Sequence, residues 1–411
     1  MKILICTAFD IDIPCAGLNR LTKMSKALEQ NGIKSIISLG SGHRGLQGKA
    51  WKYQKDQEQK YILYDKRLFN VRRHCNAMRI TGTAAKFYKK HLDEIIPNLG
   101  ITGVIVYSPQ YQLISPILTT CKKNKVFIIG DCGENYSLSF KNLLNGIIYQ
   151  QFLFRKFQMK KLNGAIVSSS RWLVETKIAN IPATIIPGFL DPNDSYRNNV
   201  SLRSKKLQIT FMGKFSGREL PSIIIKALKI CKQNKLNFKL NIVGSIRGGW
   251  LEGFWHRKLT RNSYIRNDVN ITGYVSNNEK DNILRKTDIF IMLRKPSQET
   301  EFLYPSRVSE YLFSGNPVIL TNTASLNEFF LQGSGAYFIS NKNDSEELAE
   351  LVMKLADRPL ERFKSGKKGR EYVTDTNINM TAENMCNRMV SSVERMFEEW
   401  EPKNNFILEL V

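Results

Sequence analysis

The sequence has little of what metal centres and disulfide frameworks need. Its seven cysteines are scattered without the close pairs of a metal site, and it has only four histidines. We therefore expect free thiols in a reducing cytoplasm. No stretch approaches the roughly 20 consecutive apolar residues that a membrane-spanning helix needs. The opening residues 1–6 are too few for the apolar core of a signal peptide, so we expect them to begin a domain.

Acidic residues are also scarce compared with basic ones. The chain has 61 Lys and Arg against 37 Asp and Glu, which is a formal net charge of +24. The excess is concentrated in residues 1–190, with 28 basic and 11 acidic side chains. Such a charge favours an anionic partner, for example a membrane, a nucleic acid or an acidic substrate. The alternative is a lysine-rich surface that is simply well solvated.

Short apolar segments alternate with helical stretches along the whole chain, the pattern of parallel α/β sheets. The expected strands of the first half are 2–7, 35–39, 103–107, 126–129, 165–168 and 184–186. Those of the second half are 208–212, 239–243, 270–272, 289–293, 317–320 and 336–338. A chain of 411 residues is long enough for two domains. Six strands in each half therefore predict two Rossmann-like domains.

The domain boundary is expected in the polar, turn-rich segment 191–206, which reads as a linker. The N-terminal domain would then occupy residues 1–190 and the C-terminal domain residues 207–380. Apolar residues at helical spacing predict a final helix within 381–411, with Val390 and Met396 on its buried face.

The most informative segment is 304–321, which reads as a helix, a sharp stop and a buried strand. Ser306 can cap the start of the helix, and Gly315 suits its end. Arg307 lies in its first turn and Glu310 lies one turn later. A helix start directed at the end of a parallel sheet favours an anionic ligand. The alternative is an exposed ion pair three residues apart on the helix surface.

This segment resembles the donor-site signature of family 4 glycosyltransferases, which belong to the group 1 type and have the GT-B fold. The signature is present as Pro305-Ser306-Arg307, Glu310-Tyr311-Leu312, Gly315 and Pro317-Val318-Ile319. Further matching segments follow in the family's order: 17–20, 166–170, 185–191, 211–214 with 217–218, 242–244, 271–274 and 287–290. The resemblance covers nearly the whole chain, and its specificity lies in the joint order of the motifs.

The resemblance implies two Rossmann-like domains that face each other across a cleft. The first would bind the acceptor and the second the nucleotide sugar, and the last helix would cross back to the first domain. Glu310 would hold the ribose hydroxyls of the donor. The donor-binding residues implied are Gly17, Gly213, Ser306, Arg307 and Glu310.

Two further cations, Lys214 and Arg218, follow the first strand of the second domain. Ligands of doubly wound sheets bind at the carboxyl ends of the strands. With Arg307, these cations could therefore converge on a nucleotide diphosphate and stabilise the charge on the leaving phosphate. The resemblance implies that this happens without a metal, and no cofactor is expected besides the UDP- or GDP-linked donor substrate.

Two acidic residues, Asp131 and Glu134, follow the expected strand 126–129. One of them could orient the acceptor or take its proton, so both are candidate catalytic residues. The alternative is a pair of carboxylates stabilised by a helix N-terminus.

One departure from the family pattern is clear. Better-known members carry two glutamates with seven residues between them, but the position eight residues before Glu310 is Phe302. Glu299 and Glu301 are near but out of register. The carboxylate that would contact the donor sugar is therefore missing from its usual position.

These observations predict a retaining glycosyltransferase of the hexosyltransferase class. It would use a nucleotide-sugar donor and a lipid-linked or glycan acceptor in surface polysaccharide biosynthesis. We expect a cytoplasmic protein attached peripherally to an anionic membrane surface, because segments 66–91 and 146–162 mix apolar and basic residues. Such segments can equally pack on the sheet. The alternatives are a non-catalytic GT-B subunit that binds or assembles glycans, and a sugar-nucleotide epimerase. A nucleic-acid partner is not expected, because it explains the charge but none of the motifs.

Overall fold

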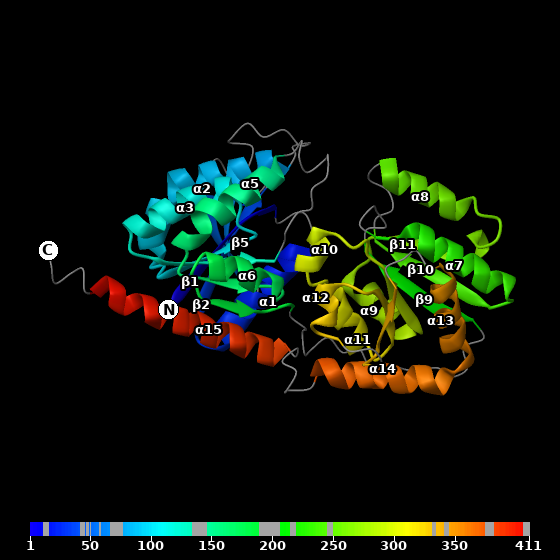
Figure 1. Cartoon of the computed structure of the whole chain (residues 1–411). Coiled ribbons are helices and arrows are strands. Elements are labelled where there is room, and N and C mark those ends of the chain that lie inside the picture. Colours follow the sequence, from blue (N-terminus) through cyan, green and yellow to red (C-terminus); the bar gives the residue numbers. More distant parts are fainter. Residues whose placement is uncertain are drawn as a thin grey trace. The chain divides into compact units, whose positions relative to one another are not determined.

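The computed structural model describes residues 1–10, 16–41, 46, 49, 51–56, 59–65, 77–133, 146–188, 206–213, 219–244, 250–330, 334–340, 345–374 and 382–405. The chain divides into two compact units. Unit 1 comprises Met1–Asp191, Phe302–Tyr304 and Ala382–Val411. Unit 2 comprises Pro192–Glu301 and Pro305–Thr381. Each unit is described by itself below, and both are drawn in Figure 1.

Unit 1 is built on an eight-stranded sheet with the order β3-β4-β2-β1-β5-β6-β7-β8. Its strands are β1 (Lys2–Asp10), β2 (Lys34–Ser41), β3 (Trp51–Asp56), β4 (Gln59–Asp65), β5 (Gly103–Tyr107), β6 (Phe127–Cys132), β7 (Gly164–Val167) and β8 (Ala183–Ile185). Every pairing is parallel except that of β3 with β4, which is antiparallel. The sequence pattern did not indicate these two strands. The reason is that β3 is a polar edge strand with Lys52, Tyr53 and Lys55 exposed.

The helices of unit 1 cover both faces of this sheet. They are α1 (Ala16–Gln30), α2 (Ala77–Leu99), α3 (Tyr111–Lys123), α5 (Ile147–Leu153), the π-helical turn η3 (Phe154–Gln158), η4 (Met159–Lys161), α6 (Arg171–Ile178) and α15 (Ala382–Asn405). Side chains from α2, α3, η3 and α6 share one core with β1, β5 and β6. The stacked rings of Tyr64 and Phe87, 4.2 Å apart, belong to this core.

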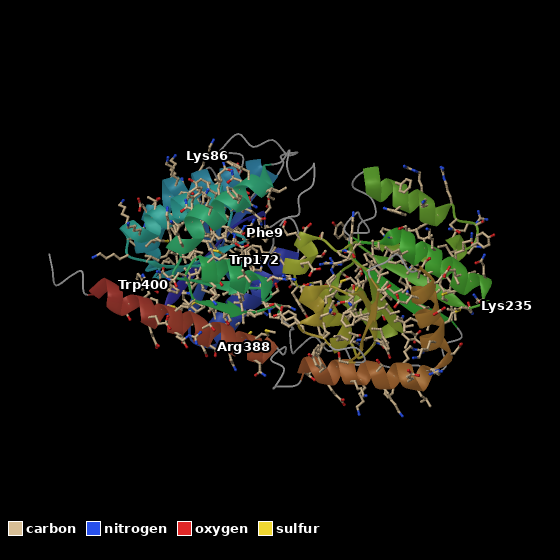
Figure 2. The ribbon with its side chains drawn as sticks, in the orientation of Figure 1. Phe9, Lys86, Trp172, Lys235, Arg388 and Trp400 are labelled. Carbon is tan, nitrogen blue, oxygen red and sulfur yellow. The ribbon has the colours of Figure 1, made fainter. Side chains whose placement is uncertain are left out.

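The C-terminal helix α15 belongs to unit 1, although unit 2 supplies most of the chain between residues 192 and 381. Its Phe397 and Trp400 rings pack edge-on against Phe127, with centroids 5.7 and 5.9 Å away. Figure 2 labels Trp400 on this helix. A Cβ on Gly164 would lie 2.3 Å from the sulfur of Met396, so the helix fits closely only because that position is glycine. Burial of these large aromatic groups stabilises the attachment of the helix.

Unit 2 has a six-stranded, fully parallel sheet with the order β11-β10-β9-β12-β13-β14. Its strands are β9 (Leu207–Met212), β10 (Phe238–Val243), β11 (Val269–Gly273), β12 (Ile289–Met292), β13 (Val318–Thr321) and β14 (Ala336–Ile339). Its helices are α7 (Pro221–Gln233), α8 (Trp250–Thr260), η5 (Arg266–Asp268), α9 (Asn277–Lys286), α10 (Gln298–Phe302), α11 (Arg307–Phe313), α12 (Ala324–Asn327), α13 (Ser345–Asp357) and α14 (Pro359–Thr374).

Local sequence signals account for the start of α9 and the end of α11 in unit 2. Ser276 and Glu279 form a reciprocal capping box at the start of α9. Gly315 has a φ of +83° just after α11, where a left-handed residue ends the helix. The central strands β12 and β13 are buried on both faces, as parallel strands covered by helices must be. Two Rossmann-like α/β units, the architecture expected from the sequence, are therefore confirmed.

Candidate functional site

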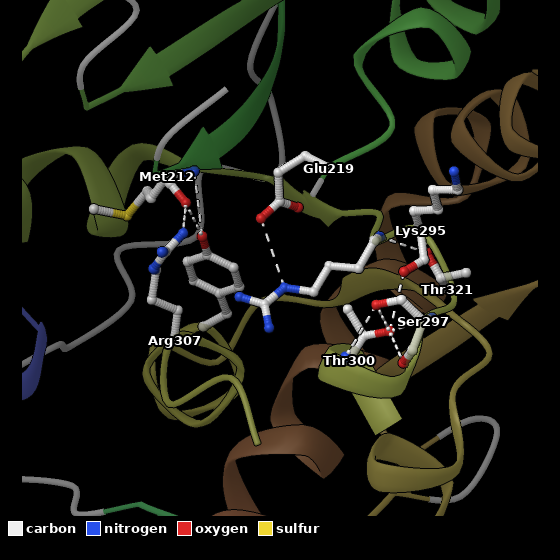
Figure 3. A network of polar contacts seen from close by, with 9 residues as sticks. Met212, Glu219, Lys295, Ser297, Thr300, Arg307 and Thr321 are labelled. Carbon is white, nitrogen blue, oxygen red and sulfur yellow. Dashed lines mark hydrogen bonds and ion pairs between the residues drawn. The ribbon is translucent and has the colours of Figure 1, made fainter. Parts of the chain in front are cut away.

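The start of α11 is anchored to the end of β9 in unit 2 (Figure 3). The Arg307 guanidinium donates a hydrogen bond to the carbonyl of Met212. The Tyr311 hydroxyl accepts from the Met212 amide at 3.2 Å and lies 3.3 Å from the Met212 carbonyl. The Tyr311 ring is buried and stacks on Phe290 with centroids 4.2 Å apart. Burial raises the pKa of Tyr311 to about 12, so its hydroxyl keeps its proton at neutral pH.

Gly213 follows Met212 and is required by both conformation and space. Its φ of +130° is one that residues with a Cβ rarely adopt. A Cβ here would also lie 1.8 Å from Nη1 of Arg307. Position 213, which the sequence predicted to bind the donor, must therefore be glycine because the Arg307 guanidinium lies too close for a side chain.

Glu310 and Arg307 each have a partner on another element. Glu310 Oε2 lies 3.8 Å from the ammonium nitrogen of Lys280 on α9, and both side chains are largely buried. The alternative of an exposed ion pair between Arg307 and Glu310 is therefore wrong. The structure places a carboxylate, an ammonium and a guanidinium close to one turn of α11. Such an arrangement can offer acceptors to hydroxyl groups and donors to anionic groups.

Ser306 immediately precedes α11, but its hydroxyl does not cap the helix. The residue has helical dihedral angles, φ −50° and ψ −26°, and its side chain makes no capping hydrogen bond. Its side chain is exposed. The expectation that Ser306 acts as an N-cap is therefore wrong, because a capping residue needs extended rather than helical backbone angles. The exposed hydroxyl remains accessible to a ligand.

The segment after β12 contributes charged residues that sequence reasoning missed. Arg294 lies at the end of this strand, its Nε 3.6 Å from a carboxylate oxygen of Glu219, and both side chains are buried. The amide of Leu220 donates to the carbonyl of Leu293 at 2.9 Å. The available signal was the position of Arg294, since polar residues directly after a parallel strand lie at the ligand-binding edge of the sheet.

Hydroxyl groups of Ser and Thr side chains hold the segment that follows β12 in place (Figure 3). The Arg294 amide donates to Oγ1 of Thr321 at 2.7 Å. The Ser297 amide donates to Oγ1 of Thr300 at 2.8 Å, and Ser325 donates to the Thr300 carbonyl at 2.8 Å. The chain leading out of β12 is therefore fixed against the end of β13.

Residues 192–372 match the model of the family described as glycosyl transferases group 1. This part of the chain, less than half of its length, is similar to that family. The match begins at the first residue of unit 2 and includes all the residues of the site described so far. The resemblance on which the sequence expectation was based is thereby confirmed.

Solved structures of glycosyltransferases have the same fold over nearly their whole length. A glycosyltransferase from Rickettsia africae is 15% identical, with a TM-score of 0.69 over 96% of this chain and 98% of that one. A sucrose-phosphate synthase from Thermosynechococcus elongatus is 11% identical, with a TM-score of 0.72 over 97% and 99%. Alr3699/HepE from Anabaena, in complex with UDP and glucose, is 12% identical, with a TM-score of 0.68 over 96% and 100%. Comparison with curated proteins by sequence finds no match. The chain has the GT-B fold of these glycosyltransferases.

Three of the four candidate catalytic residues lie outside the described residues: Lys214, Arg218 and Glu134. The residues that flank the first two are described. The Gly213 amide donates to the Val243 carbonyl at 2.7 Å, and Glu219 pairs with Arg294. The two described residues that flank them, Gly213 and Glu219, are therefore each held by a neighbouring segment.

Asp131, the other candidate acid or base, is held in a buried salt bridge in unit 1. Arg20 donates from Nε to Oδ2 at 2.9 Å and from Nη2 to Oδ1 at 3.0 Å. Arg20 also donates to the carbonyl of Ile186 at 3.1 Å. Burial would lower the pKa of Arg20, but Asp131 reverses this effect and the pKa is raised. A carboxylate with both oxygens engaged by one guanidinium suits a structural clamp better than a proton acceptor.

Gly17, expected to be a donor-binding residue, lies in α1 close to an aromatic ring. A Cβ at this position would be 2.3 Å from two ring carbons of Phe9, whose ring packs against Tyr107 with centroids 5.2 Å apart. Figure 2 labels Phe9 in unit 1. Position 17 must therefore be glycine because the Phe9 ring leaves no space for a side chain, which the sequence pattern did not reveal.

The described residues contain neither a membrane-spanning helix nor a metal-binding cluster. Among the described helices, none is long and apolar enough to cross a membrane. Within the same part of the chain, no group of three or more His, Cys, Asp or Glu side chains is placed to hold a metal ion.

Proposed function

We propose that this chain is a retaining hexosyltransferase that uses a nucleoside diphosphate sugar. The observation that carries the proposal is the cluster of Arg307, Glu310 and Lys280 at the start of α11, inside the segment that matches the group 1 family. The complexes of Alr3699/HepE with UDP and with UDP-glucose support a uridine nucleotide as the donor. A GDP-linked donor is the other member of the predicted class.

The proposed chemistry assigns each residue a task. Glu310 accepts hydrogen bonds from the ribose hydroxyls. Arg307, with Lys214 and Arg218, faces the diphosphate. The bond between the sugar C1 and the phosphate oxygen breaks, its electron pair leaves with the nucleoside diphosphate, and the fixed cations stabilise that charge. The acceptor hydroxyl oxygen bonds to C1 with retention of configuration. These cations would do the work that a divalent ion does in other enzymes.

The acceptor side of the proposal rests on unit 1. We propose that unit 1 binds a lipid-linked or glycan acceptor and that the enzyme works in surface polysaccharide biosynthesis on the cytoplasmic side of a membrane. The acceptor hydroxyl must lose a proton as its oxygen bonds to C1, and a carboxylate within hydrogen-bond reach can take it. Because Asp131 is engaged by Arg20, Glu134 is the better candidate of the two acids.

The full-length chain should be incubated with a panel of UDP- and GDP-linked sugars, and nucleotide release should be measured. Release of one nucleotide, increased by a suitable acceptor, supports the proposal. Binding without release would support the alternative of a non-catalytic GT-B subunit. Conversion of the donor to an epimeric nucleotide sugar would identify the chain as an epimerase instead.

Glu310→Ala should weaken the binding of free UDP by about 10-fold, since a hydrogen bond to a charged group contributes about 1.5–3 kcal/mol. Calorimetric titration of UDP into the full-length protein measures this. Glu371→Ala removes another ion-paired glutamate of unit 2, 3.6 Å from Lys367, and should leave the affinity unchanged. Equal UDP affinity of the Glu310→Ala variant and the wild type would show that the ribose lies elsewhere.

We also propose that unit 1 attaches the enzyme to an anionic membrane through an aromatic–basic surface. This surface consists of Tyr149, Phe152, Lys156, Phe157, Lys160 and Lys161, which lie on α5, η3 and η4. Its rings are unusually exposed, with Tyr149 at 62%, Phe152 at 47% and Phe157 at 42%. The Lys156 ammonium lies 5.5 and 5.3 Å from the centroids of the two phenylalanine rings. Segment 146–162 contains no acidic residue, so it suits an anionic interface.

Reversing the charges of Lys156, Lys160 and Lys161 to Glu should reduce co-sedimentation of the full-length protein with phosphatidylserine vesicles at least 10-fold. Each cation near an anionic leaflet contributes about 1 kcal/mol, and salt screens this attraction. The same reversal at the exposed lysines 364, 367 and 368 of unit 2 carries an equal charge change and should have little effect. Equal losses in both triple variants would assign binding to net charge rather than to this surface.

A further inference from the structure

Glu310, the residue proposed to hold the ribose, has an oppositely charged partner on another helix of unit 2. Its Oε2 lies 3.8 Å from the ammonium nitrogen of Lys280. The Glu310 side chain is only 12% exposed, and that of Lys280 is 22% exposed. A carboxylate withdrawn from water to this extent is costly unless an opposite charge lies close to it. Lys280 therefore offsets the cost of keeping the Glu310 carboxylate in this largely buried position.

The two helices that carry this pair are fixed independently of each other. The capping box of Ser276 and Glu279 begins α9, and the Lys280 amide donates to the Ser276 carbonyl at 2.9 Å. The start of α11 is attached to the end of β9, because the Arg307 guanidinium donates to the Met212 carbonyl (Figure 3). With both backbones fixed, the direction of the carboxylate depends on its side-chain torsions, and the nearby ammonium group selects among them.

The contact between the two side chains is an ion pair rather than a hydrogen bond. Hydrogen bonds from N–H to oxygen join atoms about 2.7–3.2 Å apart, and the separation of 3.8 Å lies outside this range. The ammonium group thus attracts the carboxylate without occupying an acceptor position on Oε2. A carboxylate has about four acceptor positions, so this contact leaves both oxygens able to accept from the two adjacent hydroxyls of a ribose.

We propose that Lys280 is a positioning residue that orients Glu310 for the ribose hydroxyls and thereby makes the donor site selective for ribonucleotides. The inference rests on the proposed function, in which Glu310 accepts hydrogen bonds from the ribose. Lys280 holds the carboxylate in one direction before the donor arrives, so binding does not have to order that side chain. Such preorganisation raises affinity, because less side-chain freedom is lost on binding. The gain applies only to nucleotides that carry the hydroxyls, since a site built to bind a hydroxyl rejects the analogue that lacks it.

The first test compares UDP with 2′,3′-dideoxyuridine diphosphate, which lacks both ribose hydroxyls. Calorimetric titration of the full-length wild type should show about 10-fold tighter binding of UDP. In Lys280→Met this preference should be largely lost, as in Glu310→Ala, because methionine fills similar space without a charge. Lys280→Arg keeps a cation and should retain most of the preference. GDP and its dideoxy analogue replace the uridine nucleotides if the protein prefers guanosine.

The matched control is Lys354→Met, which removes the lysine of another ion pair of unit 2. Its ammonium nitrogen also lies 3.8 Å from a carboxylate oxygen, that of Glu361, but both side chains are exposed. This variant should keep the affinity for UDP and the preference over the dideoxy analogue. Loss of the preference in both methionine variants would show an effect of net charge and would overturn the proposal.

The same titrations separate orientation from the other effects that Lys280 can have on the site. Equal losses of affinity for both nucleotides in Lys280→Met would show that the lysine supports the whole site, and would overturn its selective role. Tighter binding of UDP would show that Lys280 competes with the ribose for Glu310, which overturns that role too. If the wild type binds neither UDP nor GDP, the proposed function fails. Normal binding with an unchanged preference in Lys280→Met overturns the role of Lys280 alone.

The second test needs no nucleotide and asks whether the two side chains are coupled in the folded protein. Chemical denaturation of the wild type, Lys280→Met, Glu310→Gln and the double variant gives a double-mutant cycle. The double variant should have an equilibrium constant for unfolding about 10-fold lower than the product of the two single effects predicts. The reason is that either single change leaves the other side chain largely buried without its partner. Strictly additive effects on the free energy of unfolding would show that Lys280 does not hold the carboxylate, and would overturn the proposal.

Discussion

Gly213→Ala should lower the free energy of unfolding and reduce the affinity for UDP about 100-fold. The φ of +130° lies in a region that alanine enters at a cost of about 1–3 kcal/mol. The new methyl group would also lie 1.8 Å from Nη1 of Arg307. The guanidinium would have to leave the Met212 carbonyl, and the start of α11, with Glu310, would move with it. Chemical denaturation and UDP titration measure the two effects.

Two comparisons separate backbone strain from the steric clash. Gly100 has a φ of +61°, and a methyl group added there would have no atom within 4 Å, so Gly100→Ala carries strain alone and should keep UDP affinity. The double variant Gly213→Ala/Arg307→Ala removes the clashing group. It should be more stable than the sum of the single effects predicts, because the two residues are in contact. Strict additivity would show that Arg307 does not restrict position 213.

Most of the two sheets could be predicted from the sequence because their strands are buried on both faces. Runs such as Ile289–Met292 and Val318–Thr321 are continuous apolar segments, which are a strong local signal for parallel strands. The β3–β4 pair lacks that signal. Its edge strand exposes Lys52, Tyr53 and Lys55, and nothing in the local pattern distinguishes it from a loop.

The candidate site could be predicted only where its residues lie close together in the sequence. Arg307 and Glu310 share a helical turn, so their spacing was informative. Their partners Lys280 and Met212 could not be predicted from this spacing, because they lie on other elements, α9 and β9. Arg294 and Glu219 are 75 residues apart in the sequence. They pair because the residues just before α7 form a β-bridge with the residues just after β12.

The same limit explains why the role expected of Asp131 changed once the structure was known. From the sequence, its position after a strand suits either catalysis or structure, and that ambiguity is general for polar residues at strand ends. Arg20, 111 residues away, decides between them by engaging both carboxylate oxygens. Removing one partner of such a buried pair typically costs about 3–5 kcal/mol. A loss of activity in an Asp131 variant could therefore follow from a less stable fold alone, so the free energy of unfolding must be measured before the loss is assigned to catalysis.

Lys214→Ala and Arg218→Ala should each lower the turnover of the nucleotide sugar by about 100-fold. The motif that carries them directly follows β9, and the described ends of their loop, Gly213 and Glu219, are fixed to neighbouring strands. Charge on the phosphate increases as the sugar–phosphate bond breaks, so a fixed cation interacts more strongly with the transition state than with the bound donor. Loss of one such group typically costs about 100-fold to 1,000-fold in rate.

The predicted loss should appear in kcat rather than in UDP affinity, because the cation acts mainly on charge that develops during the reaction. Single-turnover release of UDP from the active donor separates the two. Lys286→Ala and Arg266→Ala are charge-matched controls, since both side chains are exposed cations of unit 2 at a distance in sequence from the motif. They should retain normal rates. If Lys214→Ala and Arg218→Ala behave like these controls, the leaving phosphate is stabilised by other residues, and Arg307 becomes the cation of the site to test next.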